Sequence, residues 1–257
     1  MNTLLLTWKL AKVGVHLLSG LSQCALLFPW LPLTGRNHLV QRWSRQLISI
    51  FGMTLNVSGP VHAGGAVVAN HVSWIDVFVL NAVVPCRFVA KSDVRNWPVI
   101  GWLSARAGTL YIARNRRTDL VQANAIIAGH LAAGERLAFF PEGTSGPQGL
   151  VLPFHANLFQ GIVQAQATTL PVAIAYLIPS GELNNAAEYI GDMALWESIV
   201  KLLSHGPFTA SLAFCQPIKQ NNFDRRCLAA LSHEAIVAAL DQVLHSKGSG
   251  VMANRAE

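Results

Sequence analysis

The first 53 residues are mostly apolar, and the polar residues near their start follow a helical period. These polar positions recur at alternating steps of three and four, at Lys9, Lys12, His16, Ser19 and Gln23. The spacing places them along one stripe of a helix whose remaining surface is apolar. Residues 13–35 carry no formal charge, and this length is enough to cross a bilayer, which takes about 20 residues. Pro29 and Pro32 are predicted to end or kink the helix.

The pattern of this N-terminal helix is compatible with three kinds of segment. A polar stripe on an apolar helix suits either an interfacial helix or a membrane span that packs against a partner. A secretory signal peptide is the third, with Lys9 and Lys12 as its basic start. No A-x-A-like cleavage site follows the apolar run, so the sequence favours retention as a membrane anchor.

A second amphipathic helix is predicted over residues 36–53. Its basic side carries Arg36, Arg42 and Arg45, and the stretch contains no acidic residue. Its apolar face is formed by Leu39, Val40, Trp43, Leu47, Ile50 and Phe51. Such a helix is typical of membrane-surface binding, but a helix packed on the core with a solvated basic side has the same pattern.

From residue 59 onward, short apolar runs alternate with helical stretches. The runs predict buried strands at residues 66–69, 87–90, 109–112, 137–140, 170–177 and 209–214. Helices are predicted at residues 74–83, 94–105, 119–133, 155–165, 192–203 and 229–244. This alternation predicts an α/β fold, a mixed, mostly parallel sheet flanked by helices, with N-terminal membrane-associated helices. The expected organisation is a membrane-associated helical segment at 1–56, an α/β domain at 57–246 and a flexible tail at 247–257.

Composition narrows the class of partner. Of the 257 residues, 52% are hydrophobic and only 12% are charged, against about 25% charged in ordinary soluble domains. This balance excludes an intrinsically disordered chain. The net charge is +6, and a basic chain with so few charges favours anionic lipid over nucleic acid. The four cysteines are scattered without zinc or disulfide spacing, so neither a metal site nor a disulfide framework is predicted.

A histidine and an aspartate follow the first predicted strand of the α/β region. Ligands bind at the carboxyl ends of strands in such sheets, and residues 70–76 lie at that place. His71 and Asp76 are five residues apart, a rotation of about 500° in a regular helix, so they would not share a face. They meet only if His71 precedes the helix and Asp76 lies in its first turn. Asp76 would then orient the imidazole for proton transfer, although such a histidine can also be a cap or a satisfied core group.

A second polar group follows the fourth predicted strand. Pro141 stops the strand ladder and Gly143 permits a tight turn, which displays Glu142 at the same edge of the sheet as His71. Residues 87–117 contain seven Lys or Arg residues and one acid, and Arg114 follows another strand end. Guanidinium groups bind phosphate in a bidentate manner, so a phosphate-bearing substrate is indicated, with a solvated basic face as the alternative.

Taken in order, these segments resemble a known family. The matching blocks are N-H…D at residues 70–76, G-T-L-Y-I-A-R at 108–114, F-P-E-G-T at 140–144 and L-P-V at 170–172. A linking stretch from Lys91 to W-P-V-I-G at 97–101 is similar as well. The set resembles the glycerolipid and lysophospholipid acyltransferases, the group that contains bacterial 1-acylglycerol-3-phosphate acyltransferase, over about residues 65–177.

The resemblance implies a mechanism and a substrate site. His71 would be the general base that deprotonates a glycerol hydroxyl, and Asp76 would orient it, with no acyl-enzyme formed. The acyl donor would be acyl-CoA or acyl-carrier protein, used as a substrate and with no further cofactor. The substrate-binding residues carried over by the resemblance are Lys91, Arg114, Glu142, Gly143, Thr144 and Pro171.

The chain departs from the pattern of phosphatidate-forming members at two positions. Ser145 stands where those members often carry arginine, and Ala113 stands where an acid is common. Ser145-Gly146, with L-P-F at 152–154, is similar to relatives that acylate other lysolipids, including lyso-ornithine lipid. The expected acceptor is 1-acyl-sn-glycerol-3-phosphate, with another lysolipid as the alternative.

Two other classes of protein remain possible on the sequence, a catalytically inactive lipid-binding protein and a lipid hydrolase. The expected partners are membrane lipid and the acyl donor, with no nucleic acid, and the sequence does not set the oligomeric state. The expected location is the cytoplasmic face of a bacterial inner membrane.

Overall fold

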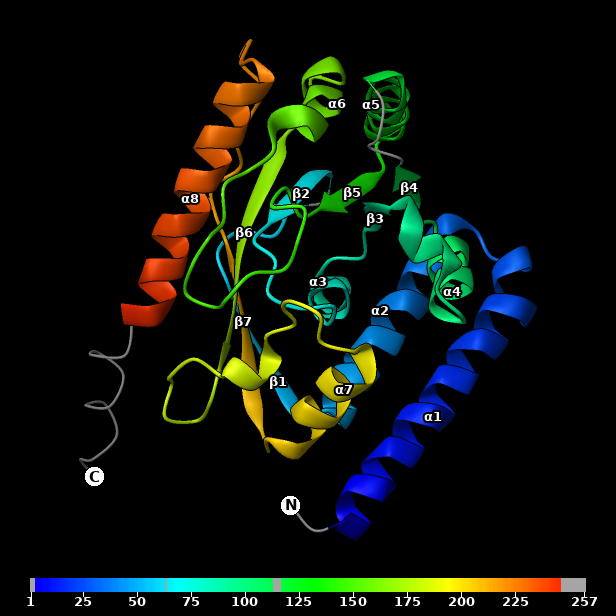
Figure 1. Cartoon of the computed structure of the whole chain (residues 1–257). Helices are drawn as coiled ribbons and strands as arrows, with labels where there is room; N and C mark the ends of the chain where they lie inside the picture. Colours follow the sequence, from blue (N-terminus) through cyan, green and yellow to red (C-terminus); the bar gives the residue numbers. More distant parts are fainter. Residues whose placement is uncertain (1–2, 63, 113–116, 246–257) are drawn as a thin grey trace, which may run out of the picture.

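The computed structural model describes residues 3–62, 64–112 and 117–245. The chain starts with two long helices, α1 (Thr3–Leu26) and α2 (Leu33–Ile50), joined by a short 3-10 turn at Phe28–Trp30. They lie side by side at one edge of the molecule (Figure 1). The two prolines explain the break, since Pro29 lies in the first turn of the 3-10 segment and Pro32 immediately precedes α2.

The described residues form a seven-stranded sheet with the strand order β1-β7-β6-β2-β5-β3-β4. The strands are β1 (Met53–Ser58), β2 (Gly65–Ala69), β3 (Arg87–Lys91), β4 (Leu110–Ile112), β5 (Arg136–Phe139), β6 (Thr169–Leu177) and β7 (Phe208–Phe214). Only the pairing of β6 with β7 is antiparallel, and the other pairs are parallel. The predicted mixed, mostly parallel sheet is therefore confirmed, together with all six predicted strands.

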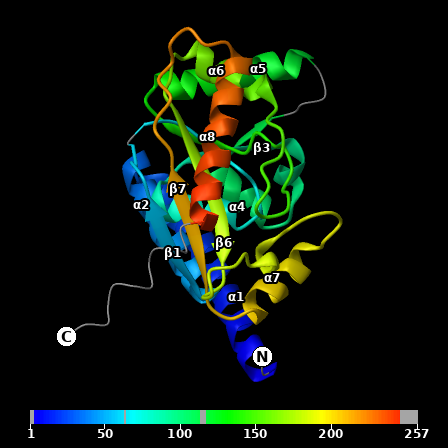
Figure 2. The same ribbon diagram turned by 90° about the vertical axis from the view of Figure 1, so that its left-hand side faces the viewer.

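Helices cover both faces of this sheet, and the pleat of the central strand divides the core between them. Val67 and Ala69 of β2 face one hydrophobic cluster, whereas Ala66 and Val68 face the other. The first cluster is closed by α2, α3 (Asp76–Val83) and α7 (Leu195–Ser204). The second is closed by α5 (Arg117–Ala132), α6 (Phe159–Gln164) and α8 (Arg225–His245). Figure 2 shows α8 lying across the sheet beside β6 and β7.

The boundary expected between the helical segment and the α/β domain is wrong by several residues. Residues 53–56 belong to β1, which pairs in parallel with β7 along its whole length. Leu47 and Ile48 of α2 and the following Phe51 are buried in the same cluster as the sheet. Of the two interpretations of the hydrophobic periodicity at 36–53, the structure shows the helix packed on the core. α2 is therefore part of the α/β domain. The tail expected at 247–257 lies outside the described residues.

Two predicted helices are also divided. The helix expected at 94–105 appears as a 3-10 segment, Ser92–Asn96, and a separate helix α4 (Ile100–Arg106). Pro98 lies between them, and a proline removes a backbone donor and restricts the preceding residue. The helix expected at 155–165 begins as a 3-10 turn, Ala156–Leu158, before α6, and α7 starts three residues later than predicted.

Parallel pairing sets the place of the polar residues. Because β2, β5, β3 and β4 run in the same direction, the loops that follow them leave from the same edge of the sheet. Residues 70–75, 92–99 and 140–155 are thereby gathered there, although they are far apart along the chain.

Candidate active site

The loop after β2 places a histidine against a buried carboxylate. His71 lies before α3, and Asp76 is the first residue of that helix. The Nδ1 atom of His71 is 2.8 Å from Oδ2 of Asp76. The same carboxylate oxygen accepts hydrogen bonds from the backbone N–H groups of Val72 and Ser73, at 2.7 and 2.9 Å. The geometry that the five-residue spacing required is confirmed. With the Nδ1 proton donated to Asp76, the Nε2 lone pair of the neutral ring can accept a proton.

The loop after β5 holds His71 from the other side. The backbone N–H of His71 donates to Oε1 of Glu142 at 3.2 Å, and the carbonyl of His71 accepts from the N–H of Gly146 at 2.8 Å. The imidazole stacks on the ring of Phe140, with centroids 4.0 Å apart and the planes 10° from parallel. The loops after β2 and β5 therefore clamp the backbone and the ring of His71 together.

Glu142 carries an unusual electrostatic environment for a carboxyl group. It is 4% exposed, and burial, with a smaller contribution from the nearby negative charge of Asp76, raises its pKa to about 8. The hydrogen bond from the N–H of His71 acts in the opposite direction. At neutral pH Glu142 is thus largely protonated and uncharged, whereas Asp76 accepts hydrogen bonds as a carboxylate.

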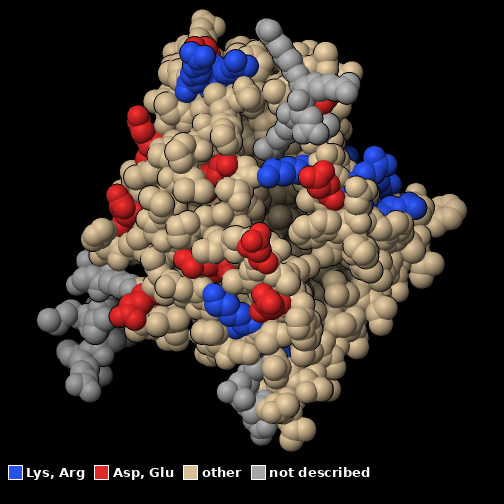
Figure 3. Space-filling view, in the orientation of Figure 1, with Lys and Arg blue, Asp and Glu red and all other residues tan. Residues whose placement is uncertain are grey.

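A cavity of about 340 Å³ lies next to Glu142. It is lined by Lys91, Leu120, Pro141, Glu142, Gly143, Thr144, His155, Asn157 and Leu158. Gly143 has a φ of 74°, in the left-handed region that favours glycine, so the turn after β5 depends on this residue. The structure therefore brings Lys91, Glu142, Gly143 and Thr144 together, as the resemblance implied. The face in Figure 3 is hollowed near its centre, where the carboxyl ends of β3 and β5 lie in Figure 1.

Two of the predicted substrate residues are not placed at this cavity. Arg114 lies outside the described residues, directly after β4, which ends at Ile112. Pro171 lies inside the sheet, where it is the register partner of Val68 and its carbonyl accepts from the N–H of Cys215. Pro171 does not line the cavity. Its register partner, Val68, lies within β2, one residue before that strand ends at Ala69.

Sequence reasoning missed several residues that contact the site. Tyr176 of β6 donates from its hydroxyl to Oδ1 of Asp76 at 2.5 Å. Asn70 exchanges two hydrogen bonds with the backbone of Ile174 on the same strand, at 2.7 and 3.0 Å. The polar residues at 70–76 drew attention to His71 and Asp76, but nothing in the sequence pairs Asp76 with a buried tyrosine 100 residues away. His155 and Asn157 were likewise assigned to a helix instead of the cavity.

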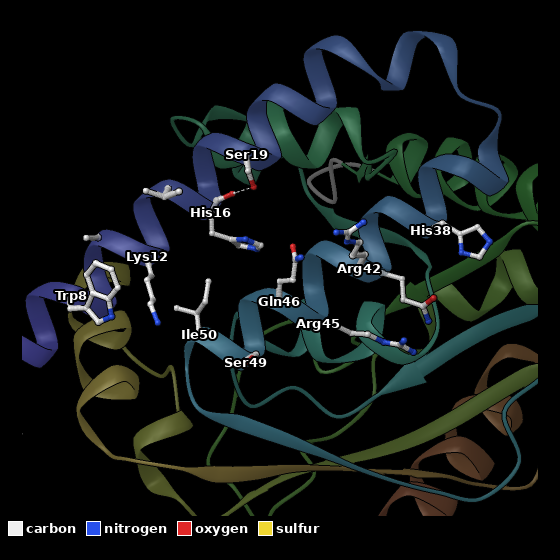
Figure 4. Close-up of a pocket in the computed structure, with 13 residues that line it drawn as sticks. Trp8, Lys12, His16, Ser19, His38, Arg42, Arg45, Gln46, Ser49 and Ile50 are labelled. Carbon is white, nitrogen blue, oxygen red and sulfur yellow. Dashed lines mark hydrogen bonds between the residues drawn. The ribbon is translucent and has the colours of Figure 1, made fainter.

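A larger cavity, of about 960 Å³, lies between α1 and α2 and away from His71. Figure 4 shows His16, Arg42 and Gln46 pointing into the space between the two helices. The other residues that line it are Trp8, Ala11, Lys12, Val15, Ser19, His38, Gln41, Arg45, Ser49 and Ile50. No Asp or Glu is among these lining residues, and burial lowers the pKa of His16, so the positive charge here comes from Lys12, Arg42 and Arg45.

Among the described residues, no group of three His, Cys, Asp or Glu side chains could hold a metal ion. The chemistry that the site itself offers is proton transfer at Nε2 of His71, next to a cavity with a lysine and an uncharged carboxyl group. A ring held by a buried carboxylate is suited to act as a general base.

Comparisons with known proteins agree on one class of enzyme. The sequence profile of the family described as Acyltransferase matches residues 55–175. The 1-acyl-sn-glycerol-3-phosphate acyltransferase of Neisseria meningitidis is 35% identical over 211 residues, which cover 80% of this chain and 82% of that protein. The lyso-ornithine lipid O-acyltransferase of Rhodobacter capsulatus is 35% identical over 209 residues, which cover 77% of this chain and 74% of that protein.

The fold has a solved counterpart as well. The crystal structure of the 1-acyl-sn-glycerophosphate acyltransferase PlsC from Thermotoga maritima matches with a TM-score of 0.69. The match covers 94% of this chain and 95% of that chain at 21% sequence identity. At this identity the likeness shows the fold, which includes the two N-terminal helices.

The raised pKa of Glu142 predicts a pH-dependent stability. Between its ordinary value of 4.5 and about 8, the carboxyl is ionised in the unfolded chain but protonated in the folded one. The free energy of unfolding should therefore fall as pH rises through this range, by up to about 1.4 kcal/mol per pH unit. Glu142→Gln keeps an oxygen for the N–H of His71 but cannot titrate, so its denaturation curves should depend less on pH.

The control is Glu234→Gln, which changes an exposed glutamate on α8. It should leave the pH dependence of unfolding as in the unmodified protein. If Glu142→Gln and Glu234→Gln gave the same slope of unfolding free energy against pH, Glu142 would not be protonated in the fold.

Proposed function

Because the chain belongs to the acyltransferase family, we propose that it transfers a fatty acyl chain from an acyl thioester to the free hydroxyl of a lysolipid. The donor in this proposal is acyl-CoA or acyl-carrier protein, the acceptor is 1-acyl-sn-glycerol-3-phosphate, and the product is phosphatidate. The observation that carries the proposal is His71, whose Nδ1 is held by Asp76 at a strand end next to a cavity. The identity to curated relatives with this acceptor supports the same reaction.

The chemistry follows from this geometry. Nε2 of His71 takes the proton of the acceptor hydroxyl as its oxygen attacks the thioester carbonyl. The new C–O bond forms, the tetrahedral centre collapses and the C–S bond breaks. The departing thiolate then takes the proton back from the imidazolium. Asp76 keeps Nδ1 protonated and stabilises the imidazolium in between, so no acyl-enzyme is needed.

The electrostatics of the cavity support an anionic acceptor headgroup. Lys91 brings a positive charge, and Gly143 leaves room for close approach to the backbone. Because the pKa of Glu142 is raised to about 8, this residue does not repel a phosphate at neutral pH and can donate a hydrogen bond to it. We include Arg114 in the phosphate site, since it follows in the sequence two residues after the end of β4.

A second acceptor class is supported by Ser145. Its hydroxyl donates to the carbonyl of Tyr189, so the position that carries arginine in many phosphatidate-forming members is engaged elsewhere. The relative from Rhodobacter capsulatus, named for lyso-ornithine lipid, is as similar as the one from Neisseria meningitidis. Lyso-ornithine lipid is therefore the alternative acceptor to be tested directly.

The N-terminal helices support attachment to the membrane. Much of the outer surface of α1 is apolar, with Leu4 77%, Leu18 64% and Leu26 68% exposed. Part of its polar stripe faces the protein instead, since Lys9 donates to the carbonyl of Leu203 and Nε2 of His16 hydrogen-bonds to the backbone carbonyl of Trp43. A helix with its apolar side outward is costly in water and favourable in a lipid interface.

Two helices of the described chain are long and apolar enough to cross a membrane, α1 with its following turn and α8. In α8, Leu228, Ile236 and Leu240 are buried in the core, which accounts for its composition without a membrane. We infer that α1 lies in the lipid interface while keeping its contacts with α2 and α7. The cationic groove between α1 and α2 (Figure 4) would face anionic lipid headgroups, on the cytoplasmic face of the membrane.

His71→Ala should reduce acyl transfer by about 10²- to 10⁴-fold, because the general base is lost. The measurement is the rate of phosphatidate formation from a labelled acyl thioester and 1-acyl-sn-glycerol-3-phosphate. The matched control is His245→Ala, at the exposed end of α8. Retention of more than a tenth of the turnover by His71→Ala would refute its role. If the unmodified protein released free fatty acid without forming a new lipid, it would be a hydrolase. If the unmodified protein showed no turnover at all, it would be a lipid-binding protein.

Arg114→Ala and Lys91→Ala should each raise the KM for 1-acyl-sn-glycerol-3-phosphate by roughly ten- to a hundredfold, with little effect on the donor KM. A charge-assisted hydrogen bond is worth about 1.5–3 kcal/mol. Arg226→Ala, exposed on α8, is the control. The assay is run in parallel with lyso-ornithine lipid. A kcat/KM that is larger for lyso-ornithine lipid than for 1-acyl-sn-glycerol-3-phosphate would assign a headgroup other than phosphate. Equal effects of these substitutions on the KM values of the donor and the acceptor would do the same.

Leu18→Asp with Leu26→Asp should release the protein from vesicles of phosphatidylglycerol and phosphatidylethanolamine in a flotation assay. Burying each apolar side chain contributes about 1.5–3 kcal/mol, so the partition coefficient should fall at least tenfold. The matched control, Val121→Asp with Ile126→Asp, changes two exposed apolar residues of α5 and should float as before. If the unmodified protein washes off with salt alone, attachment is electrostatic and the apolar surface of α1 is not the anchor.

A further inference from the structure

The two oxygens of the Asp76 carboxylate have different partners. Oδ2 accepts from Nδ1 of His71 and from the backbone N–H groups of Val72 and Ser73. Oδ1 accepts from the hydroxyl of Tyr176 at 2.5 Å. Asp76 and Tyr176 are both fully buried. The mechanism above uses the Oδ2 side and leaves the role of the phenol unexplained.

We propose that Tyr176 is a positioning residue for the general base: its hydroxyl fixes the Asp76 carboxylate and shares its negative charge, which sets how strongly Asp76 stabilises the imidazolium of His71. This inference rests on the proposed function, in which His71 takes the hydroxyl proton. It adds a third side chain to the pair and extends the proton-transfer machinery from the loop after β2 to the long strand β6.

The position of the phenol is fixed by the backbone of β6. The N–H of Tyr176 donates to Oε1 of Gln148 at 2.7 Å. Two residues earlier, the N–H and the carbonyl of Ile174 both bond to the side chain of Asn70. β2 ends at Ala69, so backbone pairing with β6 stops there. The side chain of Asn70 then supplies the hydrogen bonds to β6 where the loop begins. It thereby ties the segment that carries His71 to the strand that carries Tyr176.

The ring of Tyr176 is held as firmly as its backbone. It packs edge-on against Phe208 of β7, with centroids 6.2 Å apart and the planes at 65°. The residue is buried in the cluster formed with α2, α3 and α7. The phenol oxygen therefore stays within hydrogen-bond distance of Asp76, and the carboxylate does not depend on a mobile water for its second oxygen.

The direction of the hydrogen bond follows from the charges. Burial and the adjacent negative charge of Asp76 raise the pKa of Tyr176 well above its ordinary value, so the phenol remains a donor throughout the working pH range. The titratable groups around the carboxylate are then His71 from the loop, Tyr176 from β6 and Glu142 from the loop after β5. When His71 becomes protonated, its positive charge is opposed by a carboxylate whose charge is already partly neutralised by the phenol.

Removing the phenol therefore has a predictable sign. Without its donor, Oδ1 carries more negative charge, Asp76 becomes more basic and the imidazolium is stabilised more strongly. His71 is then protonated, and inactive as a base, at a higher pH. A tyrosine that merely fills the core would affect the stability of the fold but would leave the pH dependence of the reaction unchanged.

The test compares Tyr176→Phe with Ile236→Val, which trims a fully buried side chain on α8, away from the site. Tyr176→Phe should lower kcat about ten- to a hundredfold, because the Asp76 carboxylate is no longer fixed and His71 loses its orientation toward the acceptor hydroxyl. The KM values of both substrates should change by no more than about twofold, since Tyr176 lines neither cavity. The acid-side midpoint of the pH–rate profile should move upward by about half a pH unit or more. Ile236→Val should lower the Tm but leave kcat and the midpoint unchanged.

A second measurement keeps the ring in place and covers the case in which Tyr176→Phe does not fold. The chain has three tyrosines, and all are replaced by 3-fluorotyrosine, whose more acidic hydroxyl donates a stronger hydrogen bond. The acid-side midpoint should then move downward, opposite to the shift in Tyr176→Phe. The control is Tyr111→Phe with Tyr189→Phe, in which Tyr176 alone carries the label, and its midpoint should move downward by the same amount.

Unchanged midpoints in both tests, or a kcat of Tyr176→Phe above half the original, would overturn the role of Tyr176. A shift in the same direction for both would overturn it as well. These failures are distinct from failure of the proposed function. If His71→Ala is inactive while Tyr176→Phe is not, only the positioning role is wrong, whereas an active His71→Ala removes the premise of both.

Discussion

A fully buried carboxylate is expensive unless hydrogen-bond donors surround it, and Asp76 meets this constraint with donors from separate parts of the chain. Two backbone N–H groups come from the turn before α3, the imidazole comes from His71, and a phenol comes from β6. These donors converge only when β2, α3 and β6 are packed together. The imidazole of His71 is therefore oriented by the packed core of the α/β domain, and its geometry is part of the stability of the fold.

The second carboxyl of the site has the opposite protonation state. Burial, together with the nearby charge of Asp76, raises the pKa of Glu142 to about 8, although the backbone N–H of His71 donates to it. Two neighbouring carboxyl groups thus have separate roles, one ionised beside the base and one neutral beside the cavity. The division suits a reaction in which a proton is taken from a hydroxyl while an anionic headgroup approaches from the side of Lys91.

The same sheet also determines how the active site meets the lipid. α2 buries Leu47 and Ile48 against the sheet, and α1 lies along α2 with part of its polar stripe turned inward. The apolar residues of α1 are consequently left on the outside. A lysolipid resident in the bilayer and a water-soluble thioester require a site at the boundary between the two phases. A helix attached to the catalytic domain along its side is a physical means of holding the site there.

The sequence by itself determined every strand of the described sheet except β1, the order of the motifs and the pairing of His71 with Asp76. Their signals are local: apolar runs of strand length, prolines at helix ends, and a five-residue spacing that closes only across a helix start. The tertiary structure decided the rest. It placed residues 53–56 in the sheet and α2 in the core, because a helix with one apolar face looks the same whether a membrane or a sheet covers it. It placed Lys91 and Glu142 in the lining of one cavity and Pro171 within β6. It also placed Tyr176 against Asp76, and it paired Asn70 with the backbone of β6. Contacts between residues about 100 positions apart arise from sheet register, which leaves no pattern in either segment alone.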